Sequence, residues 1–141
     1  MLEVEPQIIE AYVRTGKLKI VYRHLLQLGA ESELLAEASE CAADQGKFWA
    51  MREELYRRLD QFYTNARAAI ERTATDLDLD AAQLGTCLDS ATHRDAVRAD
   101  FAAAEAEGIR NRPVFKIGEQ LLVGSRPFEV FQKAIDGALG G

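Results

Sequence analysis

No run of apolar residues in the sequence is long enough to cross a membrane, and charged residues make up 28% of its 141 positions. The first ten residues, MLEVEPQIIE, are acidic where a signal peptide would be basic and then apolar, so no address for export is predicted. Asp and Glu (23) outnumber Lys and Arg (17), giving a formal net charge of −6. Because a negative chain repels phosphate backbones and anionic lipid, neither a nucleic-acid partner nor membrane contact is expected.

The sequence also lacks the motifs that hold common cofactors. It contains no phosphate-binding loop, no nucleophile elbow and no dinucleotide fingerprint, so no cofactor is predicted. Its two histidines are His24 and His93, and neither has a cysteine or carboxylate at the spacing of metal ligands. No metal ligands are therefore predicted.

What the chain does contain is enough apolar material for one core. Hydrophobic residues make up 48% of the sequence, and no Gly/Ser/Pro-rich or single-sign block interrupts them. A chain of this length fits one folded domain and is too short for two ordinary ones. We therefore expect a single domain spanning residues 1–141.

The hydrophobic pattern changes period along the chain. It predicts a helix up to Thr15, a strand over Lys17–Arg23, and then a long helical block. The block begins with a Ser32-capped helix ending near Gly46, and it includes helices that start at Asn65 and at Asp80. Two short apolar runs follow, Val114–Ile117 and Gln120–Val123, joined by the turn pair Gly118-Glu119. A last helix opens after Pro127. This order predicts a mixed α/β domain with a helical insertion.

Other residue types have ordinary structural explanations. Trp49, next to Phe48, is predicted to pack in the core between helices. Cys41 and Cys87 lie on the apolar sides of predicted helices, where cysteines are usually inert. The two cysteines could form a disulfide, remain buried thiols or be unrelated.

Pro113 opens the run NRPVFKIGEQLLVGS (residues 111–125). Proline is the one residue for which a cis peptide bond costs little, about 0.5 to 1 kcal/mol against about 3 for other residues. A trans proline that simply begins a strand explains the position equally well, because the first residue of a strand needs no N–H. The spacing alone leaves both explanations open.

Several stretches taken together resemble the DsbA-like thiol-disulfide oxidoreductases. They are EPQIIEAYVRTGKLKIVYR, AEASECAADQGKFWAM, CLDS and GIRNRPVFKIGEQLLVGSRPFEVFQKAID, which cover the chain nearly end to end. The resemblance implies a thioredoxin-like fold, with residues 1–26 and 108–141 forming the thioredoxin-like part and residues 27–107 forming a helical insertion.

The resemblance also assigns roles around Pro113. It implies that Pro113 is the cis-proline of that fold and that the backbone groups of Arg112 hold an extended substrate peptide by strand-like pairing. Family members usually carry Thr or Val before this proline, so Arg112 is a departure. The resemblance further implies a disulfide between Cys41 and Cys87 that pins two helices of the insertion, with free thiols in contact as the alternative.

Catalysis by this family needs a Cys-x-x-Cys at the start of a helix, and the chain has none. The resemblance places that motif immediately upstream of Met1, so no catalytic residue is assigned within the chain. The fold is then expected to lack its first strand or strands and the start of the active-site helix. Unpaired sheet edges favour association with other chains, so a homo-oligomer is expected.

The functional hypothesis from the resemblance is a thiol-disulfide oxidoreductase acting on polypeptides with thiols or disulfides, with this chain inactive by itself. The alternative is a non-catalytic relative that binds peptides in the cis-proline groove or associates with itself through an open sheet edge. A third hypothesis is the glutathione-linked isomerase branch of the same fold. Because members of the family usually work outside the cytoplasm, the resemblance implies a location in the cell envelope, the periplasm or the extracellular space.

Overall fold

The structure is a computed structural model that describes residues 3–27 and 29–140. Residues 1, 2, 28 and 141, which the predicted domain ranges include, lie outside the described residues. The chain divides into two compact units, and each is described by itself. The first unit comprises Met1–Tyr22 and Glu105–Gly141, and the second comprises Arg23–Ala104.

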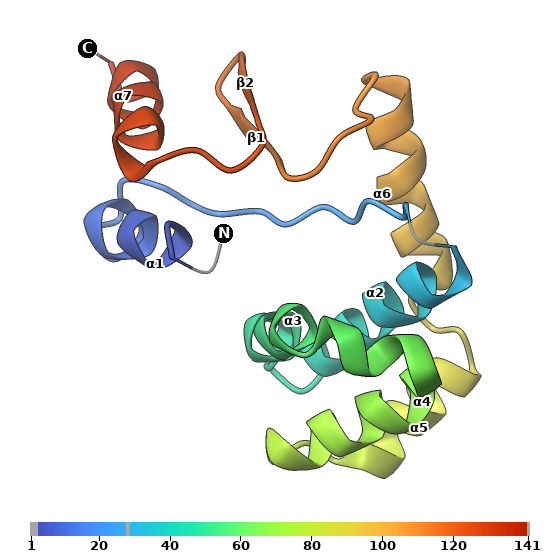
Figure 1. Ribbon diagram of the computed structural model, residues 1–141. Coiled ribbons are helices and arrows are strands. Elements are labelled where there is room, and N and C mark those ends of the chain that lie inside the picture. The colour runs from blue at the N-terminus through green and yellow to red at the C-terminus, as the bar shows by residue number, and fades with distance from the viewer. Residues whose placement is uncertain (1–2, 28, 141) are drawn as a thin grey trace. The chain divides into compact units, whose positions relative to one another are not determined.

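The first unit begins with two joined helical segments, drawn in blue in Figure 1. The α-helix α1 spans Glu5–Ile8 with proline in its first turn, where a missing N–H costs nothing. A π-helical turn, η1, continues it over Ile9–Val13, and the Arg14 N–H donates to the Ile9 carbonyl at 2.9 Å. Gly16 ends the element with φ +74°, as a left-handed helix cap requires. The single helix predicted up to Thr15 is thus two segments of different winding.

The segment Lys17–Arg23 is not a strand, which corrects the prediction. Figure 1 shows it as an extended trace, and within the described residues no other segment pairs with it in a ladder. Its burial nevertheless alternates: Leu18, Ile20 and Tyr22 are half-buried, while the residues between them are exposed. The alternating sequence pattern correctly predicted that one side of the segment is apolar and partly buried. A strand also needs hydrogen-bonded backbone partners, and the pattern gives no information about those.

The predicted hairpin is confirmed with its predicted bounds. Strand β1 spans Val114–Ile117 and strand β2 spans Gln120–Val123, paired antiparallel with Val114 opposite Val123. Gly118 has φ +56° and Glu119 is not among the positive-φ residues, which is the pattern of a type II′ turn. This hairpin is the whole sheet of the described residues.

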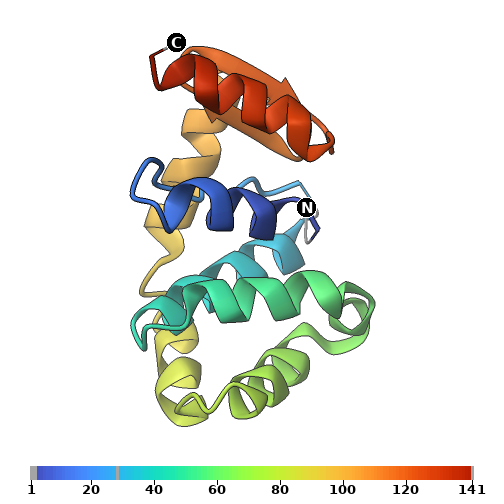
Figure 2. The same ribbon diagram turned by 90° about the vertical axis from the view of Figure 1, so that its left-hand side faces the viewer.

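The last helix, α7, spans Phe128–Ala138 and follows Pro127, as predicted. Figure 2 shows it lying alongside the hairpin. Its buried face joins the helical start of the chain and the strand β2 in one apolar cluster, whose buried members are Ile8, Tyr12, Leu122, Phe131, Ala134 and Ile135. The rings of Phe115 and Phe131 meet edge to face with their centres 4.7 Å apart.

The second unit is helical. It contains α2 (Ala30–Ala43), α3 (Phe48–Arg57), α4 (Leu59–Asp76), α5 (Ala81–Asp89) and most of α6 (Arg94–Ala106). The helices α2 to α5 pack on one another around a buried cluster that includes Ala38, Met51, Phe62, Ile70 and Leu84. The predicted helical block is confirmed.

Local details of the helical block differ from prediction. Gly29, not Ser32, occupies the N-cap of α2, and no side chain caps that end. Helix α4 begins at Leu59 and kinks at Asn65, which has φ −157° and ψ 85°, so the helix predicted from Asn65 is only its second half. Asp80 does cap α5, accepting a hydrogen bond from the Gln83 N–H at 2.9 Å.

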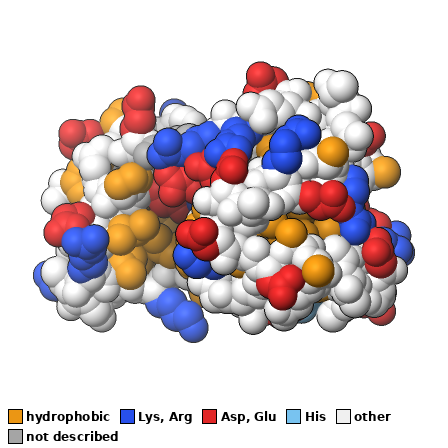
Figure 3. Space-filling model, turned by 90° about the horizontal axis from the view of Figure 1, so that it is seen from below, with side chains coloured by type: hydrophobic (Ala, Val, Ile, Leu, Met, Phe, Trp, Pro, Cys, Tyr) orange, Lys and Arg blue, Asp and Glu red, His pale blue; other side chains and the backbone are white. Residues whose placement is uncertain are grey.

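Charged side chains of both signs are interspersed on the face shown in Figure 3, with hydrophobic side chains visible between them. Among the described residues, no helix combines the length and apolar character that crossing a bilayer requires.

Together, the described elements form a mostly helical domain with one two-stranded hairpin. The sequence predicted its helical content and its hairpin.

Candidate functional site

The loop Asn111–Pro113 leads directly into β1 in the first unit. The peptide bond between Arg112 and Pro113 is cis, which confirms the prediction made from the resemblance. The N–H of Gly124, which follows β2, donates to the Pro113 carbonyl at 2.8 Å. The end of the hairpin therefore holds the last residue of the loop in place. Pro113 itself is half-buried, whereas Arg112 is exposed.

Arg112 presents its backbone without internal partners. Within the described part of the chain, no hydrogen bond engages its N–H or its carbonyl oxygen, and no carboxylate pairs with its guanidinium. An exposed residue with both backbone groups unengaged, next to a strand, can pair with an added extended chain in the manner of a β-strand. The guanidinium adds a positive charge beside that position.

The apolar cluster of the first unit supports the hairpin and carries one polar contact. The Tyr12 hydroxyl donates a hydrogen bond of 2.7 Å to Asp136 Oδ1, joining η1 to α7. The hydrogen bond to the carboxylate, together with burial, raises the pKa of Tyr12 above its usual value of 10.0. Sequence periodicity identified Tyr12 only as an apolar position, because a partner 124 residues away leaves no local pattern.

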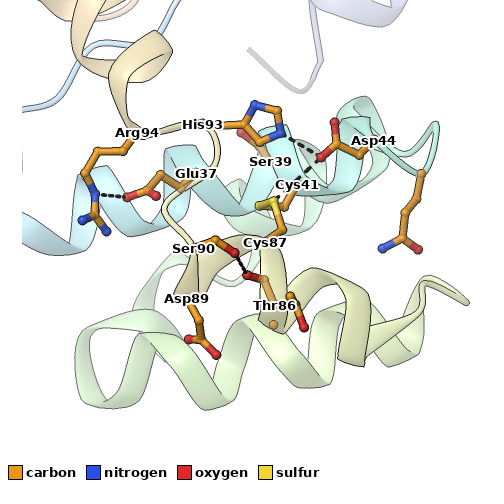
Figure 4. Close-up of a disulfide and its surroundings, with 12 residues drawn as sticks. Glu37, Ser39, Cys41, Asp44, Thr86, Cys87, Asp89, Ser90, His93 and Arg94 are labelled. Carbon is orange, nitrogen blue, oxygen red and sulfur yellow. Dashed lines mark hydrogen bonds and ion pairs between the residues drawn. A yellow bond between two sulfur atoms is a disulfide. The ribbon is translucent and has the colours of Figure 1, made fainter.

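The two cysteines form a disulfide in the second unit. Cys41 on α2 is bonded to Cys87 on α5, with their Cα atoms 5.9 Å apart, as Figure 4 shows. Among the described residues there is no free cysteine, so the alternative of two free thiols is wrong. The bond closes a loop with a sequence separation of 46 and lies in the other unit from the Asn111–Pro113 loop.

Two further side chains gather at this disulfide. His93 Nε2 lies 2.8 Å from Asp44 Oδ2, and Cys87 Sγ lies 3.8 Å from the same oxygen. The sulfurs and the His93 nitrogen all lie within 4.8 Å of one another (Figure 4). Sequence spacing found no ligand neighbours for His93, because residues 41, 44, 87 and 93 come together only when α2 packs on α5.

The other residues considered from the sequence have structural surroundings. His24 is buried, and its Nε2 lies 2.7 Å from Glu40 Oε1. Trp49 is not a core residue, which corrects the prediction: 46% of it is exposed, and the Arg52 guanidinium lies over its ring at 5.5 Å from the centre. Its neighbour Phe48 meets it edge to face.

Comparison with known proteins identifies a family for most of the chain. A family model described as thioredoxin matches residues 1–137.

Three curated relatives are sodium/proton antiporters. The chain is 28% identical to Na(+)/H(+) antiporter NhaA 3 of Salinispora tropica over 94% of its own length and 20% of that protein. It is 29% identical to NhaA 1 of Salinispora arenicola over 99% of its length and 21% of that protein. It is 34% identical to NhaA of Herminiimonas arsenicoxydans over 77% of its length and 17% of that protein. The chain therefore spans about a fifth of the length of the curated relatives it matches.

Proposed function

Because the chain belongs to the DsbA-like thioredoxin family, we propose that it forms the polypeptide-binding part of a thiol-disulfide oxidoreductase domain. The substrate is an extended polypeptide segment that carries a thiol or a disulfide. It binds at Arg112 and Pro113, where it pairs with the backbone of the loop that precedes β1.

The observation that carries this proposal is the unengaged backbone of Arg112. Arg112 is exposed, its N–H and carbonyl make no hydrogen bond within the described residues, and the hairpin holds the next residue through the 2.8 Å bond from the Gly124 N–H to the Pro113 carbonyl. A loop that is fixed on one side and open on the other offers a preformed binding edge, which lowers the entropy lost on binding.

The catalytic dithiol is not among these 141 residues. The sequence contains no Cys-x-x-Cys, and both cysteines are bonded to each other in the second unit. We therefore expect this chain by itself to reduce insulin disulfides no faster than the thiol reductant alone. Sustained turnover above that background would contradict the assignment.

Peptide binding is tested with a short synthetic peptide that contains one cysteine, followed by amide NMR of the chain. We expect the largest shift changes at Arg112 and Val114. The variant Arg112→Pro removes the N–H donor and should weaken binding about tenfold, the worth of one net hydrogen bond of about 1 to 1.5 kcal/mol.

The matched control is Arg112→Ala, which keeps the backbone N–H and carbonyl and should bind nearly as well as the wild type. Hairpin amide signals report whether either variant is still folded. Equal losses in both variants would assign the binding to the guanidinium. Shift changes confined to the second unit would place the peptide elsewhere and refute the proposal.

A second function within the same family is self-association through the hairpin. Within the described residues β1 and β2 pair only with each other, and Leu121 and Val123 on β2 are 47% and 44% exposed. Open strand edges with apolar side chains recruit further strands. Light scattering over a concentration series tests this, and Leu121→Lys should reduce any dimer. A monomer at all concentrations would exclude it.

The antiporter relatives favour a third arrangement, in which this domain is one part of a longer transport protein. The supporting observation is that the match covers 77% to 99% of this chain and only 17% to 21% of each relative. Mass spectrometry of the native polypeptide tests it: peptides of this chain should come from a protein much larger than 15.6 kDa. A native mass equal to that of the chain would exclude it.

A further inference from the structure

The disulfide of the second unit lies within a group of side chains that bind transition metals. The two sulfurs and a ring nitrogen of His93 lie within 4.8 Å of one another, and Asp44 Oδ2 lies 2.8 Å from His93 Nε2 and 3.8 Å from Cys87 Sγ. Figure 4 shows the imidazole and the carboxylate on the same side of the sulfur bridge. Two sulfurs and one imidazole form a group at the spacing of metal ligands, and the Asp44 carboxylate borders that group at His93 and Cys87.

We propose that reduction of the Cys41–Cys87 bond converts this cluster into a zinc site, with Cys41 Sγ, Cys87 Sγ and His93 Nε2 as ligands and Asp44 Oδ2 as the fourth. The inference does not rest on the proposed function, because all four residues belong to the second unit. The disulfide and the zinc site exclude each other, since a bonded sulfur is not a thiolate and only the thiolate is a ligand.

The distances fit a tetrahedral ion after one local change. With Zn–S bonds of about 2.3 Å and tetrahedral angles, the two sulfurs must lie about 3.8 Å apart. The Cα atoms of the two cysteines are 5.9 Å apart. After reduction, we expect rotation about the Cα–Cβ bonds to bring the two sulfurs to that separation. The separations of Asp44 Oδ2 from the nitrogen and from Cys87 Sγ are already close to ligand–ligand edges of such a tetrahedron.

The surroundings suit a cation that arrives from solvent. Cys41 is the most buried member of the cluster, with 2% of its surface exposed, and Cys87 is half-buried. The side chains of His93 and Asp44 are 23% and 43% exposed, so solvent reaches the cluster from their side. Arg94 is the nearest basic residue along the chain, and its guanidinium is held by Glu37 at 3.0 Å and Glu33 at 3.3 Å. Two thiolates beside a carboxylate repel one another, and a divalent ion removes that repulsion.

The chemistry balances with a dithiol as reductant. A reduced dithiol transfers two electrons and two protons to the Cys41–Cys87 bond, becoming a disulfide and leaving two thiols. Zinc then binds both sulfurs as thiolates, and the two thiol protons pass to solvent. A small-molecule disulfide reverses the sequence: it accepts two electrons from the two thiolates and two protons from solvent, becoming a dithiol, while the Cys41–Cys87 bond forms and the ion is released.

The experiment uses the whole chain, reduced without oxygen by a phosphine so that no added thiol competes for metal. Co²⁺ is the probe, because tetrahedral Co²⁺ bound to thiolates has intense visible bands and a thiolate-to-metal charge-transfer band in the near ultraviolet. We expect one Co²⁺ per reduced chain, displacement by Zn²⁺, and no binding to the oxidised chain.

Variants separate the ligands. Cys87→Ser should abolish the charge-transfer band of the site, and His93→Gln should weaken Co²⁺ binding at least tenfold while both sulfurs remain. Asp89→Asn is the matched control: it lies on α5 two residues from Cys87, but its carboxylate pairs with Arg67 at 2.8 Å and should not affect binding. Zinc should also raise the melting temperature of the reduced chain by mass action.

Several results would overturn the proposal. They are equal Co²⁺ binding by the oxidised and reduced chains, unchanged affinity in His93→Gln, and a reduced chain that binds no metal. If the reduced chain loses its structure, circular dichroism detects it; zinc should then restore the helices, and failure to restore them also refutes the site.

Discussion

Each of the two units is stabilised internally by a different kind of contact. The second unit links its helices covalently and electrostatically: the Cys41–Cys87 bond joins α2 to α5, and Arg98 reaches from α6 to Glu33 on α2 through two hydrogen bonds of 2.8 and 2.9 Å. The first unit depends on one apolar cluster, and a part-buried hydrogen bond from Tyr12 to Asp136 joins η1 to α7.

Their exposed hydrophobic residues differ as well. In the first unit they are aliphatic and include Val21, Leu121, Val123 and Leu139, which are 44% to 61% exposed. In the second unit they include Trp49, Tyr56 and Tyr63, and Arg52 lies over the rings of the first two. The unit with fewer cross-links thus carries both the proposed peptide loop and the exposed surface that is wholly aliphatic. Sites that bind chains commonly lie in the less stable part of a fold.

The largest expected effects come from truncating one core ring in each unit. Phe131→Ala and Phe62→Ala each remove a ring that is at most 2% exposed, and each should cost about 3 to 5 kcal/mol of unfolding free energy. Phe131→Ala should melt the hairpin and abolish peptide binding, because its ring packs on Phe115 of β1. Phe62→Ala should leave the hairpin intact.

The single tryptophan makes the comparison measurable. Trp49 lies in the second unit, so its fluorescence reports unfolding there, while hairpin amide signals report the first unit. If both variants shift both signals to the same denaturant concentration, the two units unfold as one, and the contrast between them fails.

The next effect is removal of the disulfide. The double variant Cys41→Ala/Cys87→Ala opens a loop with a sequence separation of 46, which on the chain-entropy model is worth about 4 kcal/mol. The loss should appear in the Trp49 signal and leave the hairpin signals unchanged. Phosphine reduction of the wild type should reproduce much of the loss and should not affect the double variant. A shift in the hairpin signals would contradict independent units.

Much of this fold was predictable because its signals are local. The hairpin bounds follow from two apolar runs and a Gly-led turn at Gly118, and the Asp80 cap of α5 follows from a residue type at a helix start. The cis bond before Pro113 and the disulfide came from resemblance to a family, since the spacing of these residues left alternatives open.

The missed features depend on contacts between distant parts of the chain. Whether Lys17–Arg23 forms a strand depends on a partner, and its alternating burial alone did not decide it. Trp49 lies on the surface with the Arg52 guanidinium over its ring, and residue type alone does not show whether a tryptophan is exposed or in the core. The cluster of Asp44, Cys87 and His93 exists only because two helices pack, so no spacing along the sequence indicates it.

A smaller effect tests the polar contact of the first unit. The hydrogen bond to Asp136 and burial raise the folded pKa of Tyr12 above 10.0, so its contribution to stability is complete below pH 10 and is lost as pH rises through the folded value. Tyr12→Phe should lower the unfolding free energy of the first unit at neutral pH. It should also make that free energy depend less on pH in the alkaline range. The measurement is the hairpin NMR signal during alkaline titration. An unchanged alkaline limb would show that this contact contributes nothing.

The smallest effect belongs to the ionic links of the second unit. The hydrogen bonds from Arg98 hold the pKa of Glu33 below its usual 4.5, so the contribution of this carboxylate is complete above pH 4.5 and is lost as pH falls through the lower folded value. Glu33→Gln should therefore destabilise the second unit slightly at pH 7 and make it less sensitive to acid, as Trp49 fluorescence can report. The effect should shrink in high salt, because exposed ion pairs are screened. Glu53→Gln is the matched control, since its pair with Arg57 lies within one helix and links no two elements. Equal acid responses in the two variants would mean that ties between helices add nothing beyond local pairs, and that the second unit is held by its core and its disulfide alone.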